Sequence, residues 1–143
     1  PYLIEYNIRM GDPECQVIMP RLKTELVEII DGAVKNKLNK IKIKWNKKKS
    51  MTIVLCTKGY PNKYKKNLPI LNLEKIKQDN DSIIYHAGTK ILNKKIFSNG
   101  GRVLSVTCLG ENYLSIRKRI IKILKKINWK HGFFRKDIGW RVI

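Results

Sequence analysis

The chain has 143 residues, 43% of them hydrophobic, and a formal net charge of +20 at pH 7. This length suits one ordinary domain, or a small domain with an appendage, and the hydrophobic content is too high for a disordered chain. No apolar run approaches the ~20 residues of a membrane-spanning helix, so we expect no membrane partner. The chain starts inside an apolar run, without Met or a signal-peptide pattern, which we interpret as the cut end of a longer protein.

The positive charge has two interpretations. A strongly basic protein attracts polyanions, and lysine-rich loops beside strands would suit a nucleic-acid-binding module. However, the basic residues are mostly Lys in a chain that is also rich in Ile and Asn, a bias typical of AT-rich coding sequence. Aromatic residues make up only 8% and do not alternate with the Lys runs as base-stacking platforms would. We therefore favour a solvated surface with no specific nucleic-acid partner, and keep the nucleic-acid-binding module as the alternative.

Three cysteines, Cys15, Cys56 and Cys108, cannot all pair with one another, and their spacing contains no C-x-x-C motif. Each lies in an apolar context with no His nearby in sequence, which argues against a metal site or a reactive thiol. We expect buried, unpaired thiols in a reducing cytoplasm.

The first part of the chain predicts a strand, a helix and a second strand. Residues 2–8 form an apolar run typical of a buried strand. A helix is expected from Glu14, interrupted at Pro20 and then continuing with apolar residues at helical spacing up to Ala33. Residues 41–45 alternate between apolar and basic, which predicts a strand with one wet face.

The remainder predicts a strand-rich unit packed by one long helix. An interior strand is expected at 50–57, followed by a basic, turn-rich segment at 62–75. Three further strands are expected at 82–86, 90–97 and 102–109, with Gly100-Gly101 as a hairpin turn between the last two.

The clearest predicted helix covers residues 112–127. Its spacing places five apolar residues on one face: Leu114, Ile120, Ile121, Leu124 and Ile127. The whole pattern predicts an α+β fold, in which a strand–helix segment precedes a strand-rich unit and the boundary falls near residues 35–44.

Candidate ligands for a metal ion stand at the start of the chain. Side chains two apart on a strand point to the same side, so Glu5 and Asn7 would present two oxygens next to each other. Oxygen donors suit Mg²⁺, which takes one or two protein ligands and completes its shell with water and phosphates. Arg9 follows on the same face, and its planar guanidinium suits a phosphate. Taken alone, an E-x-N pair is more often an ordinary polar edge of a strand.

Five short motifs in order resemble one enzyme family, the phosphoribosylamine–glycine ligases (glycinamide ribonucleotide synthetases). They are E-Y-N-I-R-M-G-D-P-E at residues 5–14, V-L-C-T-K-G-Y-P at 54–61, H-A-G-T at 86–89, N-G-G-R-V-L at 99–104 and R-K-D-I-G-W-R at 135–141. The first is similar to the end of that family's ATP-grasp domain, and the other four to its C-terminal domain. Any one of these motifs alone would be a weak signal.

The resemblance implies a division and an activity. Residues 1–38 would finish the ATP-grasp domain, and residues 39–143 would form the small C-terminal domain that walls the cleft. The family joins glycine to 5-phosphoribosylamine in purine biosynthesis, with ATP as co-substrate and Mg²⁺ (or Mn²⁺) as the metal. Glu5 and Asn7 would then hold the metal, and Arg9 would contact the phosphoryl or acyl-phosphate oxygens as a catalytic residue.

Other parts of such an enzyme are not in this sequence. The amine-substrate domain, the lid that clamps the nucleotide and an earlier metal-ligand carboxylate are absent, so the partners implied are the small substrates and the missing N-terminal part. A biotin-carboxylase-like relative also has a strand-rich C-terminal domain, but the motifs at 54–61, 86–89 and 99–104 favour the glycine ligases.

The roles of four further residues stay open. Asp12 is expected to cap the helix that starts near Glu14, whereas Glu14 either complements the helix dipole or contacts substrate. His86 is expected to be a turn residue with its hydrogen bonds satisfied. For Arg102, the sequence leaves open whether the side chain faces the active-site cleft. The segment 135–137 is expected to form a structural ion pair.

Overall fold

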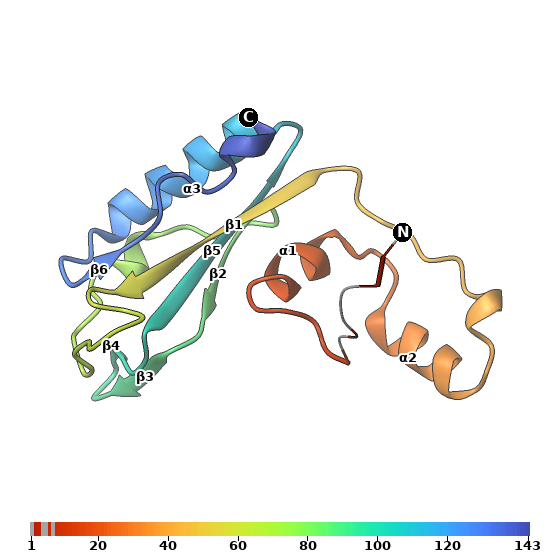
Figure 1. The fold of residues 1–143 in the computed structure, drawn as a ribbon, viewed down its shortest axis with the longest axis horizontal. Helices are drawn as coiled ribbons and strands as arrows, with labels where there is room; N and C mark the ends of the chain where they lie inside the picture. Colours follow the sequence, from red (N-terminus) through yellow and green to blue (C-terminus); the bar gives the residue numbers. More distant parts are fainter. Residues whose placement is uncertain (1, 4–5, 7) are drawn as a thin grey trace.

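A computed structural model describes residues 2–3, 6 and 8–143 of the chain. The architecture is α+β, as the sequence predicted. One long helix covers one face of an antiparallel sheet, and the short helices of the N-terminal region lie on the other side (Figure 1).

The N-terminal region, residues 8–48, consists of short helical segments joined by extended chain. These segments are α1 Cys15–Ile18, the 3-10 turn η1 Met19–Arg21, α2 Leu26–Val34 and the 3-10 turn η2 Leu38–Lys40. The predicted interruption at Pro20 appears as η1, because proline lacks the N–H that a continuing α-helix needs.

The main sheet has four strands in the order β2-β5-β1-β6, all antiparallel. Their bounds are β1 Lys49–Thr57, β2 Ser82–His86, β5 Arg102–Gly110 and β6 Gly132–Phe133. The strands predicted at 50–57, 82–86 and 102–109 are therefore confirmed. The central strand β5 is buried along almost its whole length, since helix and loops cover both of its faces.

Helix α3 Tyr113–Ile127 provides the second half of the core. Its first turn is capped by Asn112, whose side-chain oxygen accepts from the Ser115 N–H at 2.8 Å. The predicted helix is confirmed, but its buried face is rotated from the expected one, because Leu114 is 45% exposed. The residues that pack on β1 and β5 are Ile116, Ile120, Ile123, Leu124 and Ile127.

The single strand predicted at 90–97 is wrong. The segment folds as a separate hairpin of β3 Thr89–Leu92 and β4 Lys95–Ser98. Asn93 and Lys94 turn the chain, both with positive φ (47° and 59°), the geometry of a tight two-residue turn. The turn was not predicted, because these residues lack the glycine that usually occurs in a two-residue hairpin turn.

The prediction of a hairpin turn at Gly100-Gly101 is also wrong, because β4 and β5, which the pair connects, belong to different sheets. The two glycines allow close packing instead. A Cβ on Gly101 would lie 2.0 Å from the Tyr60 ring, and a Cβ on Gly88 would lie 2.7 Å from the Gly100 Cα.

The strand predicted at residues 2–8 lies partly outside the described residues, and the strand predicted at 41–45 is not formed. The described residues among 2–8 (2–3, 6 and 8) lie outside any strand and are exposed, with Tyr6 86% and Ile8 101% accessible. In residues 41–45 only an isolated bridge from Leu22 to Trp45 occurs. A strand needs a neighbour for its backbone groups, and no strand of the described part lies beside either segment.

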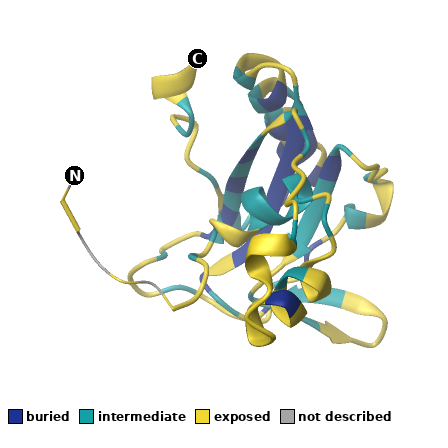
Figure 2. Cartoon of the chain, turned by 90° about the vertical axis from the view of Figure 1, so that its right-hand side faces the viewer, coloured by how far each residue is buried: buried dark blue, intermediate teal, exposed yellow. Residues whose placement is uncertain are grey.

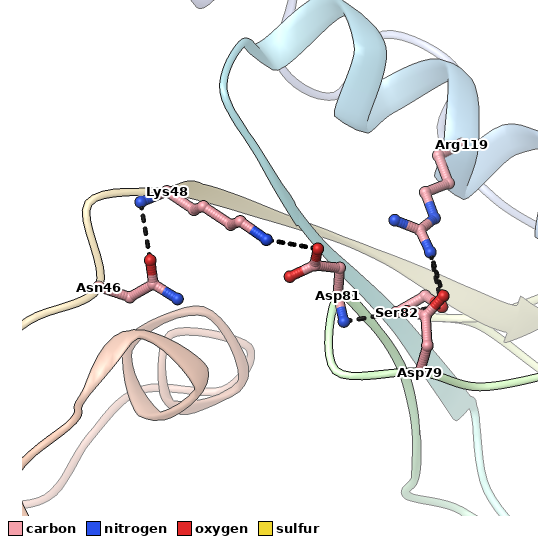
Figure 3. A network of polar contacts seen from close by, with 6 residues as sticks. All are labelled: Asn46, Lys48, Asp79, Asp81, Ser82 and Arg119. Atoms are coloured by element: carbon pink, nitrogen blue, oxygen red, sulfur yellow. Dashed lines mark hydrogen bonds and ion pairs between the residues drawn. The ribbon is translucent and has the colours of Figure 1, made fainter.

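A polar network joins α3 to the turn before β2 (Figure 3). Arg119 pairs with Asp79 at 2.5 Å, and Asp79 also accepts from the Ser82 hydroxyl at 2.8 Å. Lys48, just before β1, pairs with Asp81 at 2.5 Å. The Ser82 hydrogen bond and then the Asp81 N–H lower the pKa of Asp79, with a further contribution from Arg119.

Burial is concentrated in the sheet and α3, whereas most of the N-terminal region is exposed (Figure 2). In α2 only Gly32 is buried. Over the described residues, no helix combines the length and apolarity needed to cross a membrane.

Candidate functional site

The loop from Arg9 to Glu14 carries the described part of the first motif, and it is closed by its own hydrogen bonds. The Gly11 N–H donates to Glu14 Oε2 at 2.7 Å, and the Cys15 N–H donates to the Gly11 carbonyl at 3.0 Å. Glu14 thus folds back over the loop that precedes α1. Glycine suits position 11, because a Cβ there would lie 2.9 Å from Glu14 Oε2.

Asp12 does not cap α1, and that prediction is wrong. Its carboxylate points to the sheet, where Oδ2 pairs with Arg102 Nη2 at 3.1 Å. Arg102 Nη1 also lies 3.4 Å from the Asp12 carbonyl, and Gln16 Nε2 donates to Oδ1 at 2.9 Å. The carboxylate is occupied by these partners, and the N-cap residue of α1 is Glu14, which makes no side-chain capping hydrogen bond.

The ion pair of Asp12 and Arg102 connects two of the sequence motifs. Asp12 lies in the first motif, whereas Arg102 is the first residue of β5 and lies in the fourth. A second contact supports the same docking, since the Ser50 hydroxyl donates to the Val17 carbonyl of α1 at 2.6 Å. The loop is therefore held on the sheet face opposite α3. Sequence reasoning did not find this pairing, because no local signal links residues 90 positions apart.

An apolar cavity of about 450 Å³ lies beside this loop. Its lining includes Pro13 of the loop, Val54 and Cys56 of β1, and the aromatic residues Tyr60 and Phe133. Burial raises the pKa of the Cys56 thiol, and the Arg102 guanidinium partly opposes that shift. The thiol is therefore held in its neutral form and behaves as packing rather than as a nucleophile.

Arg9 is exposed, and its Nη1 donates to the Met10 carbonyl at 3.0 Å. Within the described ranges it forms no ion pair with Asp12 or Glu14. The predicted metal ligands Glu5 and Asn7 lie outside the described residues. In the part that is described, no three His, Cys, Asp or Glu side chains gather in a way that could hold a metal ion.

Two other sequence predictions concern the C-terminal unit. His86 is exposed at the end of β2, and its Nδ1 lies 3.1 Å from the Thr89 hydroxyl across the turn, as expected of a satisfied turn residue. Arg135 Nε donates to Asp137 Oδ1 at 3.1 Å, and this pairing lowers the pKa of Asp137. The predicted structural ion pair at 135–137 is confirmed.

Residues 50–141 match the family model described as phosphoribosylglycinamide synthetase, C domain. The chain belongs to this family. The matched residues begin in β1 and end within η4 Trp140–Val142, so they contain the sheet and α3.

The chain is also similar over its whole length to individual proteins. It is 42% identical to a phosphoribosylamine–glycine ligase of Agrobacterium fabrum over 143 residues, covering 100% of the chain and 33% of that protein. It is 41% identical to the chloroplastic phosphoribosylamine–glycine ligase of Arabidopsis thaliana over 145 aligned positions, covering 100% of the chain and 27% of the relative. The resemblance read from the five motifs is confirmed.

The crystal structure of the phosphoribosylamine–glycine ligase of Thermotoga maritima has a similar fold. The TM-score is 0.70 at 29% identity, over 96% of this chain and 33% of that one. The chain therefore spans 27–33% of the length of these relatives.

Proposed function

We propose that this chain is the C-terminal part of a phosphoribosylamine–glycine ligase that acts in purine biosynthesis. The observation that carries the proposal is the match along the entire chain, at 42% identity, to a protein of that name. We propose the domain division 1–38 and 39–143, in which the first segment ends an ATP-grasp domain and the second is the C-terminal domain. The docking of Asp12 on Arg102 would hold these two segments together.

The reaction would couple two displacements. The glycine carboxylate takes the γ-phosphoryl group of ATP and releases ADP. The amine of 5-phosphoribosylamine then attacks the carbonyl carbon of the acyl phosphate, forms the amide and expels phosphate. Activating the carboxylate first replaces a poor leaving group by a good one, so positioning and charge stabilisation become the main tasks of the protein.

Glu5 and Asn7 are the residues that would hold Mg²⁺ (or Mn²⁺), because a carboxylate and an amide oxygen form a donor set for a hard cation. The metal would neutralise charge on the phosphoryl group in transfer. Arg9 would contact the same phosphoryl oxygens. In the structure, one N–H of Arg9 donates to the Met10 carbonyl, and the exposed guanidinium has further N–H donors for an anion.

The proposed partners are glycine, 5-phosphoribosylamine, ATP and the preceding part of the same enzyme. Helix α2 supports the last of these, because its apolar side chains Val27 and Val34 are 76% and 77% exposed and would pack against more of an ATP-grasp domain. We propose a cytoplasmic enzyme with no sequence-specific nucleic-acid partner.

The test is ligation by the intact reading frame that contains this chain. ADP release should require both glycine and phosphoribosylamine, and the 143-residue chain alone should show no turnover, because most of the nucleotide clamp is missing. ADP release by the intact enzyme that is indifferent to glycine, or turnover by the isolated chain comparable to an intact synthetase, would refute the proposal.

A further inference from the structure

A basic cavity lies beyond the end of β1, separate from the loop of Arg9 to Glu14. It has a volume of about 460 Å³. We call it the lysine cavity and define it by its lining residues: Thr57, Lys58, Lys63, Tyr64, Lys65, Leu68 and His131. Its walls come from three separate segments, the end of β1, the loop at 63–68 and the residue before β6.

No carboxylate lines this cavity. In the described ranges, the five ion pairs involve other cations, and Lys58, Lys63 and Lys65 form none. Three exposed lysines thus line one hollow without a neighbouring carboxylate, and this excess of positive charge would attract an anion. The lysines of α3 line other hollows, one of them together with Lys75, Lys77 and Arg119, and there the Arg119 guanidinium already pairs with a carboxylate, that of Asp79.

The frame of the lysine cavity is fixed by backbone contacts. The Lys58 N–H donates to the His131 carbonyl at 2.8 Å, and the Thr57 N–H donates to the Gly101 carbonyl at 2.8 Å. Gly59 turns the chain with φ +99°, where a Cβ would lie 2.2 Å from the Lys63 carbonyl oxygen. The loop that carries Lys63 is thus held against the end of β1, so the cavity is preformed.

We propose that the lysine cavity binds a small phosphate-bearing anion of the diphosphate class. Lysine ammonium groups are compact, strongly hydrated point charges that suit phosphate oxygens from several directions. The volume falls in the range of small-molecule sites, and a single tyrosine ring gives no row of stacking platforms for a polynucleotide. The proposal is independent of the ligase reaction, because it needs only the C-terminal unit.

The experiment measures binding of inorganic pyrophosphate to the 143-residue chain by calorimetry at about 0.15 M salt, where exposed charges more than about 8 Å apart are largely screened. The test variant is Lys58→Gln, Lys63→Gln and Lys65→Gln combined. The control combines Lys37→Gln, Lys40→Gln and Lys42→Gln, which are exposed, form no ion pair in the described part and remove the same net charge. Far-UV circular dichroism confirms that both variants are folded.

The cavity variant should lose at least about tenfold in affinity, because three positive charges that would face the phosphate oxygens are replaced by neutral amides. The control should change the affinity by less than about threefold, because its lysines act only through the screened long-range field. Amide NMR shifts on adding pyrophosphate should include Thr57 and Lys58.

Three results would overturn the proposal. Absence of pyrophosphate binding is one. Equal losses in the two variants, which would mean attraction by net charge only, is the second. The third is an RNA oligonucleotide that binds more tightly than pyrophosphate and depends on the same three lysines.

Discussion

The two regions of this chain differ in how far their apolar side chains are buried. From β1 onward, strand and helix side chains interlock, and Ile53, Val106 and Ile120 are at most 1% exposed. Residues 8–48 instead leave Val27 and Ile30 of α2 at 76% and 53% exposure. The difference shows that the sheet and α3 form a continuous hydrophobic core, whereas the apolar side chains of α2 stay largely uncovered in the described part of the chain.

Thiol reactivity should separate the two regions by the largest factor. Cys15 in α1 is exposed, whereas Cys108 in β5 is buried, and burial raises its pKa to about 11. If reaching Cys108 requires opening the core at a cost of about 3 kcal/mol or more, its alkylation should be at least ~100-fold slower than that of Cys15 at pH 8. Iodoacetamide labelling followed by mass spectrometry measures both rates in one sample. Comparable rates under native conditions would mean that the core around β5 is not closed.

A matched pair of truncations tests the same contrast in stability. Ile120→Ala removes a side chain that is 0% exposed in α3, and it should cost about 2–5 kcal/mol in the free energy of unfolding. Ile30→Ala in α2 removes the same atoms at 53% exposure and should cost less than about 1 kcal/mol. Urea denaturation of both variants gives the two values. Similar costs would remove the distinction between the two regions.

The contact between the regions is predicted to matter for order more than for stability. Arg102→Gln breaks a half-exposed ion pair with Asp12, so the free energy of unfolding should fall by about 1 kcal/mol or less. Hydrogen exchange at residues 11–15 should nevertheless accelerate, because the loop loses its anchor on β5. Arg135→Gln, which breaks the ion pair with Asp137, is the control and should leave exchange in that loop unchanged.

The charge swap of Asp12→Arg with Arg102→Asp should restore slow exchange in the loop. Unchanged exchange in Arg102→Gln, or no recovery in the swap, would show that the ion pair does not hold the loop.

The smallest expected effect is a pH dependence at the turn before β2. The pKa of Asp79 is lowered by the Ser82 hydroxyl, the Asp81 N–H and Arg119, so its ionised form favours the folded state. This stability is fully present above the unfolded value of about 3.9 and is lost as pH falls through the lower folded value. Asp79→Asn should therefore melt below the wild type at pH 7, and the difference should shrink below about pH 4. A constant difference from pH 7 to pH 3 would contradict this assignment.

Sequence reasoning succeeded where local pattern and tertiary packing agree. The strands at 82–86 and 102–109 and the helix capped by Asn112 were predictable because periodicity, turn residues and burial all indicate the same element. It failed at residues 41–45, where the alternating pattern indicated a strand but only an isolated bridge from Leu22 to Trp45 forms. It also missed the turn at Asn93-Lys94, because left-handed backbone at a lysine leaves no sequence signal.

The site was predictable only in part. The five motifs taken together identified the family, and the comparisons confirmed it. The role of Asp12 was assigned wrongly, because a carboxylate before a helix fits a cap equally well, and only the fold brings Arg102 to it. The lysine cavity could not be predicted from the sequence either, because its lysines come from separate segments that only the fold brings together.

The proposed function is tested most directly by the two proposed metal ligands in the intact enzyme. Glu5→Gln should lower kcat by about tenfold or more, and Asn7→Leu should do the same, while the fold is preserved, because each would remove one of the two proposed Mg²⁺ ligands and weaken charge neutralisation of the phosphoryl group. Glu28→Gln, a substitution in the first turn of α2, is the matched control and should retain wild-type kinetics. The measurement is steady-state ADP release at saturating and at limiting Mg²⁺. Wild-type kinetics of both site variants at limiting Mg²⁺ would contradict the account.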